Sequence, residues 1–392
     1  MTLDGRVMGP LGQVRRTIFA AHRADLNFTG CGIGFRRRGG QVTDEPVVIA
    51  MVVRKRPEAS ISRMRLLPRA IDVAGRPWGV DVVEVGPLTA TGLTSVPLAD
   101  AAVAPAADGL TPDTPVTQQL VRPPKPGCSI SNFNSGPLGT LGCFATDNTD
   151  GTVGVVSAAH VLARYGAAKT GELIIQPAVA DKGVQADGIA SLKRFVPVGS
   201  STNYVDAGLA LLTDQAAYST DVVGGFMSPI SPSHPAVGMV VADDSAACGE
   251  NCFLSRMDRT ISQLNVSLIG STSSSTAVVA PKIGMHIEKA GRTSEYTATV
   301  VDAVGTQIKV NYGGTTVTFS DMIWTQAMGL GGDSGAVACK GGNGTTYAPL
   351  PPWCTNPSPC ALVDAFATYY NLPLTTAPTS RSRTRSATTS WR

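Results

Sequence analysis

The sequence predicts a mainly β protein with a small α+β unit at its N-terminal end. From Gly136 to about Ala365, short runs rich in Val, Ile, Thr and Leu alternate with clusters of Gly, Asn, Asp and Pro. The 392 residues include 42 Gly and 27 Pro, and such frequent turn residues favour short strands over long helices. Hydrophobic residues make up 43% and charged residues 16%, which excludes global disorder and a coiled coil. Among these runs, Tyr296–Ala303 and Gln307–Tyr312 predict two strands, and Gly313-Gly314 predicts a two-residue hairpin turn before Thr315–Phe319. Regular short strands over a segment of this length indicate β-barrels or a β-sandwich.

Residues 1–95 predict the small α+β unit. Leu11, Val14 and Ile18 recur at helical spacing within residues 10–26, and arginines occupy the opposite face. The strand-like runs that follow are Cys31–Phe35, Val47–Arg54 and Val80–Val85.

Two further segments lack the pattern of a folded core. Residues 96–127 contain seven prolines and many alanines, and they predict an extended linker. Residues 375–392 are rich in Ser, Thr and Arg, and they predict a disordered basic tail. Residues 128–374, which lie between the two, are therefore expected to form the main β domain.

Charge and apolar patterning give no reason to expect a nucleic-acid or membrane partner. The formal net charge is +3, and no stretch of about 18 apolar residues occurs. Residues 1–86 are basic, which we interpret as a solvated surface, with docking to an acidic partner as the alternative. The glycines at 30, 32 and 34 precede a strand rather than a helix, so they do not form a dinucleotide fingerprint. No signal peptide is recognised, which predicts a cytoplasmic location, with export by another route left open.

Eight cysteines occur, and without an export signal most are expected to be buried free thiols. Two closely spaced pairs, Cys248 with Cys252 and Cys354 with Cys360, lie in polar loops and could form disulfides in an oxidising compartment. No histidine lies at ligand spacing from either pair, so we expect no zinc site and no other metal.

The strongest candidate for chemistry is Ser334, in the run Gly331-Gly332-Asp333-Ser334-Gly335. Glycine allows a tight turn that exposes a serine hydroxyl. The N–H groups of Gly332 and Ser334 could then point at one spot and form an oxyanion hole. A glycine-rich hairpin loop without chemistry is the alternative.

A serine nucleophile needs a base, and His160 is the best placed of four histidines because it follows a buried strand and small residues. His22 is expected on the exposed side of the helix, His234 in a loop, and His286 at an ordinary strand position. Asp206 stands at the head of an apolar strand, where a carboxylate is costly to bury unless it is paired. It could hold the imidazole in the required tautomer. An ordinary buried histidine and a turn aspartate are the alternatives.

Three segments resemble, in their chain order, the three motifs of the trypsin/chymotrypsin-like serine peptidases. These segments are Ser157-Ala158-Ala159-His160, Val205-Asp206-Ala207-Gly208-Leu209 and Gly332-Asp333-Ser334-Gly335. Three flanking segments resemble more specifically the plant Narrow-leaf-1 type and its bacterial relatives. These are Arg122–Ile130, Gly139–Cys143 and Lys289–Thr293.

The resemblance implies a trypsin-like double antiparallel β-barrel with the active site between the barrels. It implies that Ser334 attacks a peptide carbonyl, that His160 transfers the proton, and that Asp206 orients His160. Gly332 and Ser334 would hold the oxyanion, and neither a metal nor an organic cofactor is needed. Met328 falls at the base of the specificity pocket, where a methionine predicts an apolar or small P1 side chain. Asp333 would be structural and would need a cationic or hydrogen-bonding partner.

The serine endopeptidase hypothesis, with a protein or peptide as substrate, has two alternatives. One is a catalytically silent binding or scaffolding protein, which the intact set of His160, Asp206 and Ser334 argues against. The other is an esterase with the same triad, which the sequence does not separate from a peptidase. The N-terminal unit is expected either to regulate the enzyme until it is cut off near Arg122 or Lys125, or to stay attached for docking or homo-oligomerisation.

Overall fold

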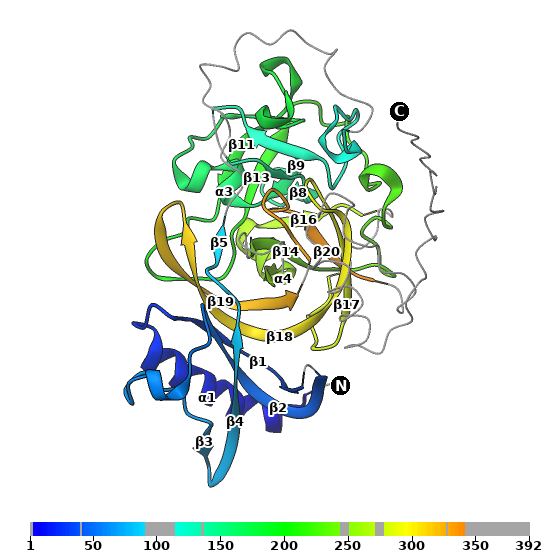
Figure 1. Cartoon of the computed structure of the whole chain (residues 1–392). Coiled ribbons are helices and arrows are strands. Elements are labelled where there is room, and N and C mark those ends of the chain that lie inside the picture. Colours follow the sequence, from blue (N-terminus) through cyan, green and yellow to red (C-terminus); the bar gives the residue numbers. More distant parts are fainter. Residues whose placement is uncertain are drawn as a thin grey trace, which may run out of the picture.

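The computed structural model describes residues 3–39, 41–90, 114–134, 137–243, 251–270, 278–326 and 328–341. Their strands form an eight-stranded and a 12-stranded sheet, and the two lie one beyond the other along the molecule (Figure 1). This arrangement confirms the expected mainly β, trypsin-like double-barrel fold. The predicted tail at 375–392, most of the predicted linker, and Cys248, Cys354 and Cys360 lie outside the described residues.

The N-terminal unit contains helix α1 (Gly5–His22), which packs against β1 and β2. The helix begins earlier than predicted because the Asp4 carboxylate caps it, accepting the N–H groups of Arg6 and Val7. The expected exposure of His22 is wrong, because its ring lies against Phe28 and only 8% of the residue is exposed. The other elements are β1 (Phe28–Arg38), β2 (Gln41–Val52), η1 (Glu58–Ser60), β3 (Ala70–Val73), β4 (Arg76–Glu84) and β5 (Thr89–Ala90).

The first sheet has the strand order β16-β8-β9-β13-β11-β10-β6-β7. Its strands are β6 (Ser129–Asn132), β7 (Gly139–Thr140), β8 (Cys143–Asp147), β9 (Val153–Ser157), β10 (Leu173–Ile175), β11 (Gly188–Phe195), β13 (Gly208–Leu212) and β16 (Val266–Leu268). Alternate apolar side chains from these strands, among them Phe144, Val155 and Ile174, form one buried core. A short helix that the sequence did not predict, α4 (Met257–Leu264), precedes β16.

The second sheet closes on itself, because β18 pairs with both β17 and β19 and so completes a six-stranded ring through β15, β14 and β20. Its strands are β12 (Thr202–Asn203), β14 (Ala236–Asp243), β15 (Asn251–Arg256), β17 (His286–Gly291), β18 (Glu295–Tyr312), β19 (Thr315–Gln326) and β20 (Val337–Lys340). The pattern predicted two strands where the structure has β18 alone, because irregular pairing near Gly305 bends the strand without ending it. The expected turn at Gly313 and Gly314 is confirmed, with φ of 59° and 88°.

The N-terminal unit continues this second sheet, because β1 pairs antiparallel with β18. A Cβ atom on Gly30 would lie 2.2 Å from the carbonyl oxygen of Gln307, and one on Gly32 would lie 2.5 Å from Oγ1 of Thr306. The alternating glycines therefore let β1 lie flat against β18, which accounts for a motif that superficially suggests nucleotide binding. Figure 1 shows the blue strands of this unit beside the yellow β18.

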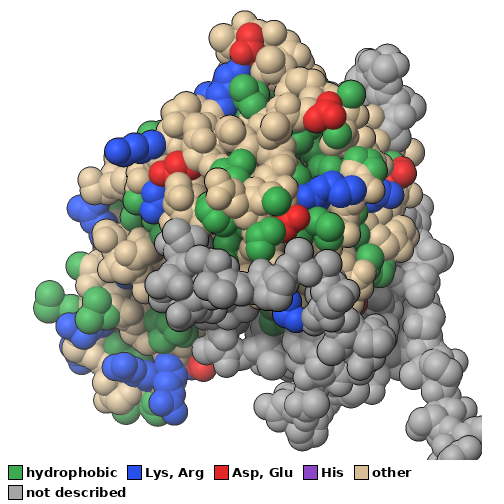
Figure 2. Space-filling view, turned by 90° about the horizontal axis from the view of Figure 1, so that it is seen from above, with side chains coloured by type: hydrophobic (Ala, Val, Ile, Leu, Met, Phe, Trp, Pro, Cys, Tyr) green, Lys and Arg blue, Asp and Glu red, His purple; other side chains and the backbone are tan. Residues whose placement is uncertain are grey.

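The distribution of charged side chains on the surface and the burial of the cysteines are consistent with the composition. On the face drawn in Figure 2, Lys, Arg, Asp and Glu side chains are distributed among neutral and hydrophobic ones. Cys31, Cys128, Cys143 and Cys339 are buried free thiols, and burial raises the pKa of Cys31 to about 12. Within the described ranges, no helix has the length and hydropathy that crossing a membrane requires.

Candidate active site

The pairing of two strands brings His160 and Asp206 together. In the antiparallel pair β9 and β13, Ser157 lies opposite Gly208. His160 follows Ser157 by three residues, in helix α3 (Ala159–Leu162), and Asp206 precedes Gly208 by two. Both residues therefore lie just beyond the same end of this strand pair.

His160 and Asp206 form a buried hydrogen-bonded pair. Nδ1 of His160 is bonded to Oδ2 of Asp206, and the main-chain N–H of His160 donates to Oδ1 at 3.1 Å. Both residues are 0% exposed. The carboxylate accepts the Nδ1 proton, so Nε2 is left as the basic nitrogen of the neutral ring.

Nε2 of His160 is buried and has no hydrogen-bond partner among the described residues. Leaving a buried polar atom unpaired costs about 1–3 kcal/mol. Such an atom calls for an explanation, and a general base that waits for a substrate-side proton supplies one.

Ser334 lies just before β20 in the second sheet. The parts of the molecule built on the first and second sheets are called the first and second barrels. Gly332 and Gly335 have φ of 100° and 92°, so the loop turns sharply on either side of the serine. A Cβ atom on Gly335 would lie 2.0 Å from Oγ of Ser157 and 2.9 Å from the main-chain nitrogen of Ala158. The serine loop therefore touches the end of β9 that leads into His160.

Thr140 holds the carbonyl groups on both sides of the nucleophile loop. Its Oγ1 donates to the Gly332 carbonyl at 2.9 Å, and its main-chain N–H donates to the Ser334 carbonyl at 2.9 Å. The N–H groups of Gly332 and Ser334 have no hydrogen-bond acceptor in the described part of the chain. These two predicted oxyanion donors are thus without an acceptor among the described residues, while Thr140 holds the carbonyl groups of the same residues.

Asp333, next to the nucleophile, is fully buried and has the cationic partner that the sequence called for. Nζ of Lys289 lies 3.0 Å from Oδ2, and four donors from residues 293, 294 and 330 complete the shell. Burial alone would raise the pKa of Asp333, but the Lys289 charge and these hydrogen bonds lower it overall. The nucleophile loop is therefore fixed by an internal ion pair.

Arg292 extends this support to the first barrel. Its Nε donates to Asp181 at 2.9 Å, its main-chain N–H donates to Thr140 Oγ1 at 2.9 Å, and its carbonyl accepts from Thr117 Oγ1 at 2.9 Å. The segment Lys289–Thr293 therefore has a structural role. It joins the nucleophile loop, the first barrel and the chain that enters it.

Two tyrosines that sequence reasoning missed lie against the His160–Asp206 pair. The hydroxyl of Tyr312 donates to Oδ1 of Asp206 at 2.9 Å. The ring of Tyr165 stacks on the His160 ring with centroids 5.6 Å apart. Tyr165 and Tyr312 are separated from Asp206 by 41 and 106 residues, so no local pattern could have marked them.

Met328 and His234 have other surroundings. Met328 is 1% exposed and packs in the core of the second barrel with Val240 and Leu254, so its role in substrate specificity stays a prediction. His234 is buried and its Nε2 lies 2.7 Å from Oε1 of Glu288, away from the candidate triad.

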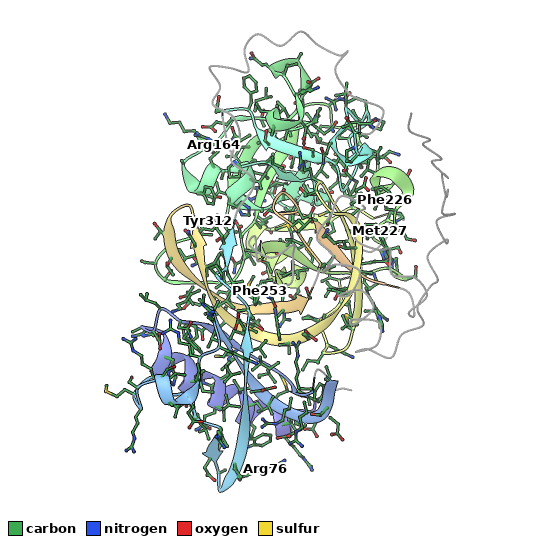
Figure 3. The ribbon with its side chains drawn as sticks, in the orientation of Figure 1. Arg76, Arg164, Phe226, Met227, Phe253 and Tyr312 are labelled. Carbon is green, nitrogen blue, oxygen red and sulfur yellow. The ribbon has the colours of Figure 1, made fainter. Side chains whose placement is uncertain are left out.

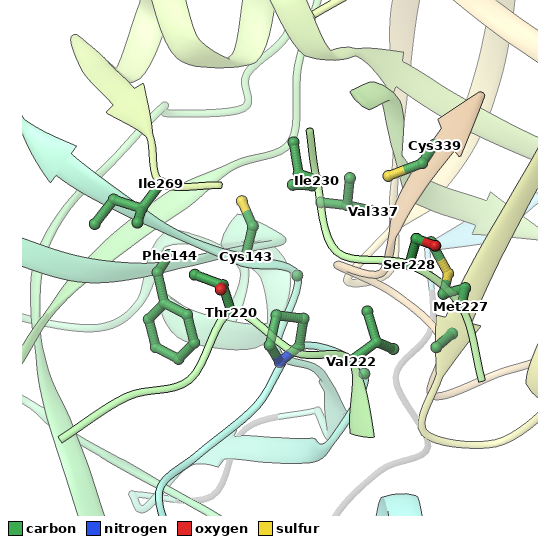
Figure 4. Close-up of a pocket in the computed structure, with 14 residues that line it drawn as sticks. Cys143, Phe144, Thr220, Val222, Met227, Ser228, Ile230, Ile269, Val337 and Cys339 are labelled. Carbon is green, nitrogen blue, oxygen red and sulfur yellow. The ribbon is translucent and has the colours of Figure 1, made fainter. Parts of the chain in front are cut away.

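A small cavity lies behind β20, lined by apolar side chains such as Val222, Ile230 and Val337 and by the thiols Cys143 and Cys339 (Figure 4). Its volume of about 20 Å³ is enough for one water molecule. Neither His160 nor Ser334 lines it. In the described residues, no group of three or more His, Cys, Asp and Glu could hold a metal ion.

Comparison with known proteins gives distant structural matches. No protein-family model and no curated protein matches the chain. Among solved structures, a Nocardiopsis protease matches with 18% identity and a TM-score of 0.30, over 55% of this chain and 78% of that one. A glutamic acid-specific serine protease matches with 20% identity and a TM-score of 0.29, over the same shares, 55% and 78%. Thermobifida fusca protease A matches with 13% identity and a TM-score of 0.30, over 64% and 98%.

Proposed function

We propose that the chain is a serine peptidase that hydrolyses peptide bonds with Ser334 as nucleophile. The observation that supports this most directly is the state of His160. Its Nδ1 is bound to a buried carboxylate, while its Nε2 is buried and unpartnered among the described residues. His234 shares this pattern, because its Nε2 is bound to Glu288 and its Nδ1 is also buried and unpartnered among the described residues. What distinguishes His160 is its position, because it follows the end of β9 that the Ser334 loop touches.

The geometry suits a two-step acyl transfer. Ser334 Oγ forms a bond to the substrate carbonyl carbon as its proton passes to Nε2 of His160. Asp206 stabilises the imidazolium, and the N–H groups of Gly332 and Ser334 receive the oxyanion. The imidazolium then gives its proton to the leaving amine as the C–N bond breaks, and a water molecule deacylates Ser334 by the same route in reverse.

Substrate binding requires a local opening of the site. His160 is 0% and Ser334 1% exposed, so a peptide reaches them only after neighbouring groups move. The proposal includes a protein or peptide substrate with an apolar or small P1 side chain next to Met328. It also includes the finer resemblance to the Narrow-leaf-1 type. The cytoplasmic location and homo-oligomerisation stay predictions.

The test is covalent labelling of the full-length protein by a fluorophosphonate probe, which reacts with activated serines. Wild type should be labelled, and Ser334→Ala and His160→Ala should not. A matched control is His234→Asn, which alters another buried, carboxylate-bound histidine and should leave labelling intact. A folded wild type without labelling, or labelling that survives Ser334→Ala, would refute the proposal. Peptide and ester substrate panels would then separate a peptidase from an esterase.

A further inference from the structure

Tyr312 binds the Oδ1 atom of the Asp206 carboxylate and helps to fix its orientation. It is the last residue of β18, is 6% exposed, and donates its hydroxyl proton to Oδ1. Within the described ranges, the remaining donors to the Asp206 carboxylate both come from His160 itself. Tyr312 is therefore the donor from the second barrel that orients this carboxylate.

Tyr165 packs against one face of the imidazole of His160. Its ring lies nearly parallel to that of His160, at 21°, and meets Tyr312 edge-on with centroids 5.0 Å apart. Tyr165 and its neighbour Arg164 have φ of 57° and 49°, a conformation that is uncommon for residues other than glycine. Glu172 binds the Arg164 guanidinium at 3.0 and 2.8 Å and so holds this turn in place. Strained backbone of this kind is concentrated at functional sites.

Both tyrosines are held by β5, the end of the N-terminal unit. The Tyr165 hydroxyl donates to the carbonyl of Ala90 at 2.8 Å, and Ala90 pairs with Tyr312 in a parallel ladder. Leu88 and Ala90 are 4% and 0% exposed, in the same core cluster as Tyr312. Tyr312 and Arg164 lie near the junction of the two sheets, on the same side of the molecule (Figure 3).

We propose that Tyr312 and Tyr165 are positioning residues for the His160–Asp206 pair, and that β5 holds them in place, so that the N-terminal unit is a required part of the catalytic unit. This inference rests on the proposed function. Removing the N-terminal unit by a cut near Arg122 or Lys125 would remove β5, leave the Tyr165 hydroxyl without its acceptor, and uncover the edge of β18. The inference therefore favours the attached N-terminal unit over the removable one.

The first experiment is Tyr312→Phe, which removes one hydroxyl and keeps the ring. The rate constant for fluorophosphonate labelling should fall about 10- to 100-fold, the range expected when a hydrogen bond to a charged group is lost. The pH profile of labelling should also change, because the carboxylate that accepts the Nδ1 proton has one donor fewer and is no longer held in one orientation. The groups that face the imidazole are Asp206, Tyr165 and Tyr312, while Arg164 is bound to Glu172.

Tyr218→Phe is the matched control, since Tyr218 is a half-buried tyrosine that packs on Phe144 in the first barrel. It should change neither the rate constant nor the pH profile. Tyr165→Phe removes the bond to Ala90 and should reduce labelling by about 2- to 10-fold. A Tyr312→Phe protein with wild-type rate and profile would overturn the positioning role.

The role of β5 is tested by a specific protease site inserted within residues 91–113 of the full chain. After cleavage the two fragments should remain associated and labelling should persist, because the β1–β18 ladder and β5 are intact. Stripping the N-terminal fragment with mild denaturant should abolish labelling, and adding it back should restore labelling. Unchanged or faster labelling of the separated C-terminal fragment would overturn this part of the proposal.

A failure of the proposed function is distinguishable from a failure of this inference. The downfield proton resonance of the Nδ1–H group of His160 reports the pair directly, without any reaction. If wild type is not labelled but Tyr312→Phe shifts this resonance and Tyr218→Phe does not, the positioning holds and the peptidase activity fails. If labelling depends on Ser334 but Tyr312→Phe changes neither the resonance nor the rate constant, the peptidase activity holds and the positioning role fails.

Discussion

Two carboxylates flank the candidate site at the same depth but are held in opposite ways. Asp333, beside the nucleophile, is 0% exposed and faces the ammonium group of Lys289. Asp206 is also 0% exposed, but its donors are the imidazole and main chain of His160 and the hydroxyl of Tyr312. The charge of Asp333 is balanced within the folded loop by Lys289. In the proposed mechanism, that of Asp206 is left for the imidazolium that forms during reaction. The first carboxylate thus supports structure, and the second has the role of supporting the proposed chemistry.

The largest effect is expected from Asp206→Asn. An amide keeps the shape of the side chain but cannot stabilise the imidazolium, so the rate constant for probe labelling should fall by about 10⁴-fold. The free energy of unfolding should change much less than this loss in rate implies. Asp214→Asn, in an exposed turn, is the control. A loss below tenfold would mean that Asp206 is a structural residue like Asp333.

Next in size is the effect of Lys289→Met. This change leaves the Asp333 carboxylate buried without its cation and should lower the free energy of unfolding by about 3–5 kcal/mol. Denaturant titration with a fluorescence readout measures it. The double variant Lys289→Met/Asp333→Asn should recover a large part of the loss, because no buried charge remains. If the double variant is no more stable than the single one, the ion pair is not what holds the loop.

The comparison also predicts a dependence on pH. The pKa of Asp333 is lowered in the folded state, so its contribution to stability is complete above the ordinary carboxyl value of 3.8 and is lost as pH falls through the lower folded value. The stability difference between wild type and Lys289→Met should therefore shrink as the pH falls below about 4, by about 1.4 kcal/mol for each pH unit in that range. Unfolding at a series of pH values measures this, and a difference that grows in acid would contradict it.

The smallest effect is expected where an ion pair lies in solvent. The Arg69 and Glu58 side chains form such a pair in the N-terminal unit, with exposures of 91% and 63%. Glu58→Gln should change the free energy of unfolding by about 0.5 kcal/mol or less. A loss comparable to that of Lys289→Met would show that burial is not what separates the two pairs.

The sequence predicted well where local chemistry decides structure. The Gly313–Gly314 turn, the first helix and the strand before His160 were all read from short-range patterns. Its errors were also local, as at His22, whose helical position suggested exposure although Phe28 covers it. The two-strand reading of β18 failed because a bend at Gly305 looks the same in sequence as a strand end.

By itself, the sequence determined the mainly β fold class, because strand periodicity and glycine-rich turns are properties of neighbouring residues, and it singled out His160, Asp206 and Ser334 as candidates. Only the tertiary structure decided which groups support them. Lys289 meets Asp333 across 44 residues, and Tyr312 meets Asp206 across 106. Such contacts are set by strand register and barrel closure, which fix distances between residues that no local pattern relates. The same register places β5, from the N-terminal unit, beside the tyrosines of the candidate site.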